Sequence, residues 1–195
     1  MGTQGKFGFL YKGKLYMRYN HEDSEPDCLG VHLLLEILHA NLDDWIKLLE
    51  NIKEVPHGVE PTQEDIEKLK KYTCLEVSQG STKEWYCLLR YTQGSFYHVL
   101  NSGYLENVKG DVYDEYTYVL DLDNMVFKAK GDDLDEVEIK LEKEVLMKYA
   151  KEWSKGHLDE EYDPEKQLMK TKERFEMPGK LAAEAMQKWR ENSGN

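Results

Sequence analysis

Two strand-like stretches joined by Lys12-Gly13 decide how the fold begins: KFGFLY at residues 6–11 and KLYMRY at residues 14–19. A two-residue loop ending in glycine between two such runs predicts a β-hairpin. Both faces of this hairpin carry apolar side chains. Strands that are apolar on both faces are typical of a sheet that is covered on both sides, so we expect helices on both faces.

The register of this hairpin brings the returning chain back to its own start. It places Phe7 opposite Arg18 and, one step further out, Thr3 opposite Glu22. The returning stretch is YNHEDSEP at residues 19–26, which holds several side chain types used in catalysis and binding. We therefore expect a polar pocket near the N-terminus.

Two interpretations of this polar stretch differ in their chemistry. In the catalytic interpretation, His21 is a general base, Asp23 orients it, and Asn20 or Thr3 helps to bind the reacting oxygen. On a strand, Ser24 points away from the other two side chains, which argues against a self-contained Ser-His-Asp triad. In the structural interpretation, Asp23 and Ser24 form a turn or cap the next helix. The structural interpretation is favoured.

Hydrophobic periodicity along the rest of the chain predicts an α+β fold, with a mostly antiparallel sheet and helices packed on it. Helices are expected over 31–53 and from Thr62 to near Tyr72. A third is expected from Asp135, because apolar residues recur at every fourth position from Val137 to Trp153. Strands are expected over 73–78, 84–91, 115–122 and 125–130. We expect a single domain over 1–156, then a charged connector and a C-terminal helical appendage over 157–195, helical through Trp189.

Composition narrows the classes of partner. The 195 residues carry a formal net charge of −12, and no concentrated basic cluster is present to bind a phosphate backbone, so nucleic-acid binding is disfavoured. No apolar run is long enough to span a bilayer, and no signal-peptide pattern is present. Cys28, Cys74 and Cys87 show no CxxC spacing, which suits reduced thiols in a cytoplasmic, intracellular protein.

The stretch from His32 to His39 presents a possible metal-binding pattern. On a helix, His32, Glu36 and His39 share one face, where three ligands could meet a metal ion. The spacing differs from the His-Glu-x-x-His zinc signature, and a polar stripe opposite leucines is more typical of a solvent face. We therefore expect no metal and no cofactor.

The stretch VLDLDN at residues 119–124 resembles the first motif of the haloacid-dehalogenase-like phosphatases. The resemblance implies that Asp121 is a nucleophile and Asp123 an acid/base. Met125 stands where that family usually has threonine, and the residues after it look like an immediate return strand. An ordinary hairpin turn is therefore favoured over phosphatase chemistry.

The start of the chain also resembles the opening of an uncharacterised family found in fungi and large DNA viruses. The resemblance is carried by GTxG at 2–5, GKxY at 13–16 and YNHxDSxPxxLG at 19–30, and residues 115–123 resemble that family's later strand. Gln4 replaces the family's usual arginine, and Glu25 replaces an aromatic residue. The resemblance implies no known activity.

A fainter likeness connects the predicted architecture to the N-terminal-nucleophile hydrolases. Those enzymes also open with a strand, a hairpin and an Asn-x-Asp-like segment beside the first residue. Their chemistry needs cysteine, serine or threonine at the exposed N-terminus. Here removal of Met1 would expose Gly2 and leave Thr3 second.

Two functions follow as expectations. The first is an intracellular binding or interaction protein, with a small molecule or a protein as partner, that uses a polar pocket near the N-terminus. The alternative is a hydrolase with His21 and Asp23 as the acid–base pair, and phosphatase-like use of Asp121 and Asp123 is a remote alternative. The late amphipathic helices could pair between copies, which would make a homo-oligomer.

Overall fold

The computed structural model describes residues 2–56, 58–108, 115–158 and 162–173. Its main sheet has five strands in the order β2-β1-β5-β6-β7, in which β1 and β5 are parallel and the other neighbours are antiparallel. The strands are β1 (Gly5–Tyr11), β2 (Lys14–Asn20), β5 (Tyr116–Asp121), β6 (Val126–Gly131) and β7 (Leu134–Lys140). Two short parallel strands, β3 (Lys53–Glu54) and β4 (Tyr104–Leu105), form a separate pair.

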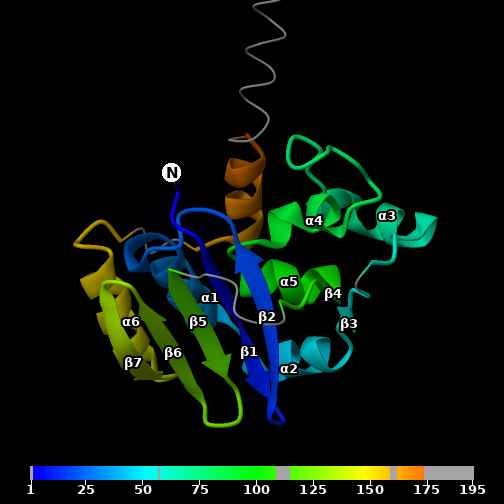
Figure 1. Ribbon diagram of the computed structural model, residues 1–195. Coiled ribbons are helices and arrows are strands. Elements are labelled where there is room, and N and C mark those ends of the chain that lie inside the picture. Colours follow the sequence, from blue (N-terminus) through cyan, green and yellow to red (C-terminus); the bar gives the residue numbers. More distant parts are fainter. Residues whose placement is uncertain (1, 57, 109–114, 159–161, 174–195) are drawn as a thin grey trace, which may run out of the picture.

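Helices fill the segments between and after these strands (Figure 1). They are α1 (Val31–His39), α2 (Leu42–Glu50), α3 (Gln63–Leu69), α4 (Trp85–Leu88), α5 (Phe96–Ser102) and α6 (Lys143–Trp153). Short helical turns are η1 (Pro26–Gly30), η2 (Lys70–Tyr72) and η3 (Arg90–Thr92), and residues 164–173 are also helical. The predicted α+β class with a mostly antiparallel sheet is confirmed. No described helix is both long enough and apolar enough to cross a membrane.

The N-terminal hairpin forms in the predicted register. Phe7 pairs with Arg18, and Tyr11 pairs with Lys14 across the two-residue turn. Lys12 and Gly13 have φ angles of 50° and 71°, the left-handed pair that a type I′ turn requires. This turn matches the right-handed twist of the two strands, so local sequence is enough to set their pairing.

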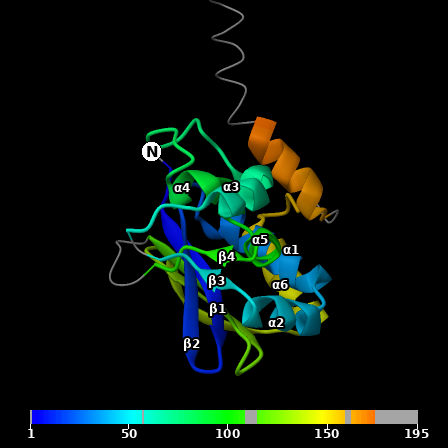
Figure 2. The same ribbon diagram turned by 90° about the vertical axis from the view of Figure 1, so that its right-hand side faces the viewer.

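The described helices gather on one side of the main sheet (Figure 2). Phe7 and Phe9 point to that side and are buried in a core that includes Phe96 and Phe127. The expectation of helices on both faces is not met within the described chain. The opposite face carries charged and apolar side chains and is hollowed, and β2 lies at the outer edge of the sheet.

A second hydrophobic cluster lies beside the main core, around α3, α4 and η3. It contains Leu69, Tyr72, Leu88 and Tyr91. Leu168, from the helical residues 164–173, is buried in the same cluster. The described start of the predicted C-terminal appendage therefore packs against the body of the protein.

The predicted helix over 31–53 is interrupted. Ala40 has an extended backbone, with φ −74° and ψ 145°, so the helical hydrogen bonding stops there and divides the segment into α1 and α2. Asn41 then caps α2, because its side chain accepts a hydrogen bond from the backbone N–H of Asp44. Both helices contribute apolar residues to one core, which is why the hydrophobic period runs through the break.

Two other predicted segments change their type. Residues 73–78 and 84–91 were expected as strands, but they hold turns, α4 and part of η3. A backbone hydrogen bond from Cys74 N–H to the carbonyl of Cys87 joins the two segments. The helix expected from Asp135 begins only at Lys143, because β7 occupies the preceding residues. The helix start at Thr62 is confirmed by a complete capping box. The final predicted helix lies outside the described residues.

Candidate functional site

A buried turn follows β2 and is held by the start of the chain. The side-chain amide of Asn20 donates to the carbonyl of Glu22 at 2.6 Å and to Ser24 Oγ at 2.8 Å. The backbone N–H of Ser24 donates to Thr3 Oγ1 at 3.0 Å. The hairpin therefore does return residues 20–24 to the N-terminus, and Thr3 and Asn20 use polar atoms to fix the turn.

The sheet supports the same turn from below. Tyr118 of β5 donates its hydroxyl proton to the carbonyl of Ser24 at 2.9 Å, and Ser24 is fully buried. A Cβ atom at Gly5 would lie 2.9 Å from Ser24 Oγ and 2.8 Å from the carbonyl oxygen of Tyr116. Only glycine fits at position 5, so β1 can approach the turn closely.

His21 and Asp23 leave this turn toward different hollows. Asp23 has a φ of 56°, a left-handed conformation that ends the strand alternation from which a common direction was expected. His21 is exposed, with ring Nδ1 3.1 Å from the hydroxyl of Tyr19, and lines a hollow with Gln4 and Tyr86. Asp23 lines a separate polar cavity. The two side chains expected to act as a pair therefore do not line a common space.

A chain of polar contacts links the turn to η3. Glu22 pairs with Arg90 at 2.8 Å, and Arg90 also donates to Gln93 Oε1 at 2.7 Å. The backbone N–H of His21 donates to the same Gln93 oxygen at 3.1 Å. These two donors fix which end of the Gln93 amide is oxygen, because both of them need an acceptor.

The polar cavity lies where three distant segments meet, and its volume is about 280 Å³. Residues 20–32 form one wall, residues 90–98 form another, and Gln167, Leu168 and Thr171 of the C-terminal helical residues line it as well. This volume lies just below the usual range for ligand pockets, about 300–1,000 Å³. A molecule of small-metabolite size would fit.

Side chains that line the polar cavity include buried polar atoms without a hydrogen-bond partner among the described residues, among them Gln93 Nε2 and His98 Nδ1. Burial lowers the pKa of His98, so the ring is neutral at pH 7. Its Nε2 lies 2.9 Å from the carbonyl oxygen of Pro164, which can only accept, so Nε2 carries the proton and Nδ1 is an acceptor. The residues of the cavity wall thus include a buried donor, Gln93 Nε2, and a buried acceptor, His98 Nδ1.

Glu36 is the centre of a neighbouring buried network. Its carboxylate accepts from the hydroxyls of Ser95 and Tyr162 and from the backbone N–H of Tyr97, and His32 Nε2 lies 3.3 Å away. Burial alone would raise the pKa of Glu36, but the contacts with His32, Ser95 and Tyr162 outweigh burial and lower it. The network connects α1, the start of α5 and the chain near Tyr162.

The metal interpretation of the α1 stripe gains no support from this arrangement. His39 Nδ1 contacts the carbonyl of Leu35 at 2.8 Å, and its ring stacks on Tyr162. Within the part of the chain that the structure describes, no group of three or more His, Cys, Asp or Glu residues could hold a metal ion. Glu36 is buried rather than on a solvent face, which differs from the expected polar stripe.

Asp121 and Asp123 hold two hairpin turns. Asp121 is buried and accepts from the backbone N–H groups of Asp123 and Asn124 and from Lys128 Nζ. Asp123 accepts from the backbone N–H groups of the hairpin turn between β1 and β2, at 2.7 and 2.8 Å. The β5–β6 hairpin therefore agrees with the turn interpretation of this motif.

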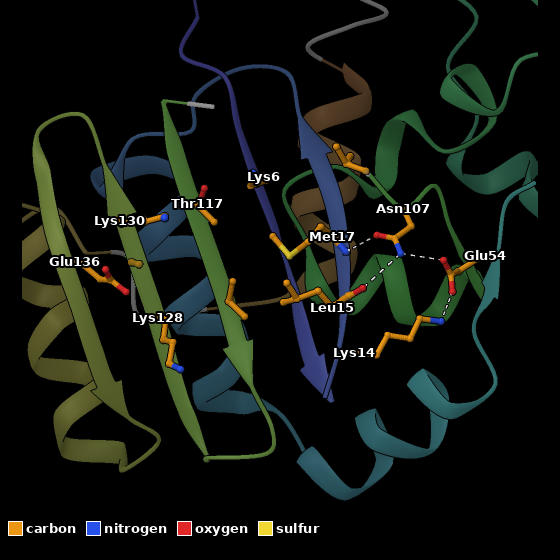
Figure 3. Close-up of a pocket in the computed structure, with 13 residues that line it drawn as sticks. Lys6, Lys14, Leu15, Met17, Glu54, Asn107, Thr117, Lys128, Lys130 and Glu136 are labelled. Atoms are coloured by element: carbon orange, nitrogen blue, oxygen red, sulfur yellow. Dashed lines mark hydrogen bonds and ion pairs between the residues drawn. The ribbon is translucent and has the colours of Figure 1, made fainter. Parts of the chain in front are cut away.

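A second hollow, of about 730 Å³, lies on the open face of the sheet and is here called the sheet-face hollow (Figure 3). It is lined by residues of all five strands of the main sheet, of β3 and of a neighbouring loop, among them Lys6, Met17, Thr117, Val119, Lys128 and Lys130. At one side, Asn107 bonds to the backbone N–H of Met17 and to Glu54. This hollow shares no lining residue with the polar cavity.

Sequence reasoning identified Thr3, Asn20 and the turn, but it missed Arg90, Gln93 and His98. Arg90 lies in a segment that was expected to be a strand, and Gln93 and His98 lie where no element was predicted, so no local pattern marked them. Searches of protein-family models, curated proteins and solved structures gave no match to this chain. Function is therefore inferred from the geometry of its own residues.

Proposed function

We propose that the protein is a binding protein that holds a small polar molecule without net charge in the polar cavity beside the N-terminal turn. The observation that supports this proposal most directly is the pair of buried, unpartnered atoms, Gln93 Nε2 and His98 Nδ1. Buried polar groups in folded proteins nearly always have a partner, so such a pair in one cavity calls for a ligand that offers an acceptor and a donor. Amides, amino acids and nucleobases have this combination.

The surroundings of the cavity favour binding over chemistry. Thr3 and Asn20 use polar atoms to hold the turn, and Ser24 is fully buried beneath it. Glu22 and Arg90 form an ion pair at the cavity wall, so these two charges neutralise each other before any ligand enters. A wall whose guanidinium is already paired suits recognition of a polar molecule without net charge.

The proposal is tested by thermal unfolding in the presence of free amino acids, primary amides and nucleosides. A ligand that binds only the folded chain raises its Tm by mass action. The substitution Gln93→Glu keeps an acceptor for Arg90 and removes the donor at Nε2. Gln63→Glu, at an exposed position of α3, is the matched control.

At least one class of compound should raise the Tm of the wild type and of the Gln63→Glu variant while leaving Gln93→Glu unchanged. If every compound acts equally on all three proteins, or none acts on the wild type, this cavity is not a ligand site.

Hydrolysis by His21 is the second candidate. It is favoured by the place of His21 beside a hollow at the N-terminus, with Nδ1 within hydrogen-bond distance of Tyr19. Hydrolysis of p-nitrophenyl acetate that is lost in His21→Ala and kept in His157→Ala, another exposed histidine, would support it. Equal rates in the two variants would exclude a special role for His21.

A further inference from the structure

We infer that a hollow between α1, α2 and α5 is a second binding site, which takes the trimethylammonium group of a small molecule. This hollow has a volume of about 310 Å³ and is here called the aromatic hollow. It is lined by residues of these three helices and by the chain at 162–164. It shares no described lining residue with the polar cavity, so the inference does not depend on the function proposed above.

Aromatic rings from separate parts of the chain line the aromatic hollow. They belong to His39 of α1, Trp45 of α2, Tyr97 of α5 and Tyr162. The rings of Tyr162 and His39 are stacked, with centroids 5.8 Å apart and an interplanar angle of 28°. Trp45 is buried and packs against phenylalanines of the main core, which fixes its position. The faces of such rings attract a cation that has lost its hydration shell.

Glu36 brings a buried negative charge to the same hollow. Its side chain is fully buried, and its polar contacts lower its pKa, so the carboxylate is ionised at pH 7. Charged side chains are almost never fully buried unless they are paired. Among the described residues, no lysine or arginine contacts Glu36 or lines the aromatic hollow. His32, 3.3 Å away, lines the polar cavity instead and carries a positive charge only when it is protonated.

The hydrogen-bond donors on Glu36 satisfy its oxygens without cancelling its charge. Ser95 and Tyr162 donate hydroxyl protons, and Tyr97 donates its backbone N–H. Burial and the Glu36 carboxylate raise the pKa of Tyr162, so its hydroxyl stays neutral. With His32 close by, the carboxylate has about as many donors as its two oxygens accept. A primary ammonium group would have to displace one of these donors, whereas a methylated ammonium group needs only charge and contact.

The rest of the lining and the size of the hollow suit methyl groups. Ala40, Leu48 and Pro164 add apolar surface. Asp44 also lines the hollow, but it pairs with Lys47 at 2.8 Å, so Glu36 is the carboxylate there that lacks a lysine or arginine partner. A volume of about 310 Å³ is near the lower end of the range for small-molecule pockets, about 300–1,000 Å³. A molecule of choline size suits this space.

The test is calorimetric titration of the full chain with choline and two analogues. In 3,3-dimethylbutan-1-ol a carbon atom replaces the charged nitrogen, so shape is kept and charge is lost. Ethanolamine keeps the charge and lacks the three methyl groups. Choline should bind at least about tenfold more tightly than either analogue. This comparison uses the unaltered protein, so it does not depend on how a variant folds.

Substitutions then locate the bound choline. Tyr97→Leu removes one ring and should weaken choline binding by about fivefold or more, whereas Tyr97→Phe keeps the ring and should stay within about twofold of the wild type. Tyr149→Leu, at a half-buried position of α6 outside the hollow, is the matched control and should bind as the wild type does. Glu36→Gln removes the charge and should weaken binding by about tenfold, provided that circular dichroism shows a folded chain.

A further titration identifies the source of the trimethylammonium group. Nα-acetyl-Nε-trimethyllysine amide carries the same group on a protein-like backbone. Tighter binding of choline than of this compound would support a free small molecule. The reverse order would overturn that assignment and identify a methylated protein side chain as the ligand.

Three results would contradict the trimethylammonium site itself. Choline does not bind the wild type, the uncharged alcohol binds as tightly as choline, or Tyr97→Leu and Tyr149→Leu bind choline equally well. Loss of choline binding in Gln93→Glu but not in Tyr97→Leu would place choline in the polar cavity instead. Failure of choline to bind leaves the function proposed for the polar cavity untouched, because that proposal is tested with other compounds.

Discussion

Thr3 Oγ1 accepts a hydrogen bond of 3.0 Å from the backbone N–H of Ser24, and this contact ties the start of the chain to the turn after β2. Ser24 is fully buried, so its N–H cannot form a hydrogen bond with water instead if the Thr3 hydroxyl is removed. The contact joins residues 21 positions apart in sequence and fixes one wall of the polar cavity.

Thr3→Val should lower the free energy of unfolding by about 1–3 kcal/mol, because it leaves a buried donor without a partner. Thr3→Ser keeps the hydroxyl, so its free energy of unfolding should fall much less. Urea unfolding followed by tryptophan fluorescence measures both values, and equal losses in the two variants would show that the hydroxyl is not what holds the turn.

Glu36→Gln should make stability less dependent on pH. The pKa of Glu36 is lower in the folded chain than its usual value of 4.5, so its contribution is present above that value and is lost as pH falls through the folded-state pKa. At pH 7 the variant should be less stable by about 1–3 kcal/mol, and the difference should shrink below about pH 4.

Urea unfolding across this pH range measures the Glu36 effect. Glu76→Gln, at an exposed site, is the control, and its stability should follow that of the wild type at every pH. A constant difference between Glu36→Gln and the wild type would contradict the ionised state of Glu36.

Gly8→Ala should destabilise the protein by more than about 3 kcal/mol or prevent folding, because the new Cβ would press on the backbone of β2. Gly103→Ala is the same substitution at a left-handed position, φ 72°, with open space around it. It should lower the free energy of unfolding by only about 1 kcal/mol. Thermal unfolding by circular dichroism compares the two, and similar losses would mean that β1 and β2 are less closely packed at Gly8.

Leu168→Ala should lower the free energy of unfolding by about 2–4 kcal/mol, since Leu168 is 4% exposed in the second hydrophobic cluster. Its neighbour Met169 is 59% exposed, and Met169→Ala should change stability by no more than about 0.5 kcal/mol. Chemical denaturation of the full chain distinguishes them. Equal small effects would show that residues 164–173 are not part of the folded core.

Elements with local signals could be predicted from the sequence. The β1–β2 hairpin follows from side-chain alternation and Lys12-Gly13, and α3 follows from the capping box at Thr62. In each case the groups that decide the structure are only a few residues apart. The segment therefore keeps its strand or helix conformation wherever the rest of the protein buries its apolar face.

The segment from Val137 to Trp153 shows why other elements were missed. A spacing of four residues fits a helix, but it is also twice the strand period of two, and Val137 and Leu141 fit either pattern. Packing decides between them: the edge of β6 is open to receive β7, and the helical form begins only after Glu142.

The sequence by itself determined the first hairpin, its register and the return of residues 20–24 to the N-terminus, because neighbouring side chains and a two-residue turn control those features. Only the tertiary structure decided the polar cavity and the sheet-face hollow. His21 meets Gln93 across 72 residues, and the sheet-face hollow is lined by strands that are far apart in the sequence. Contacts of this kind depend on how distant segments close around a common core, and no local pattern of residues encodes that closure.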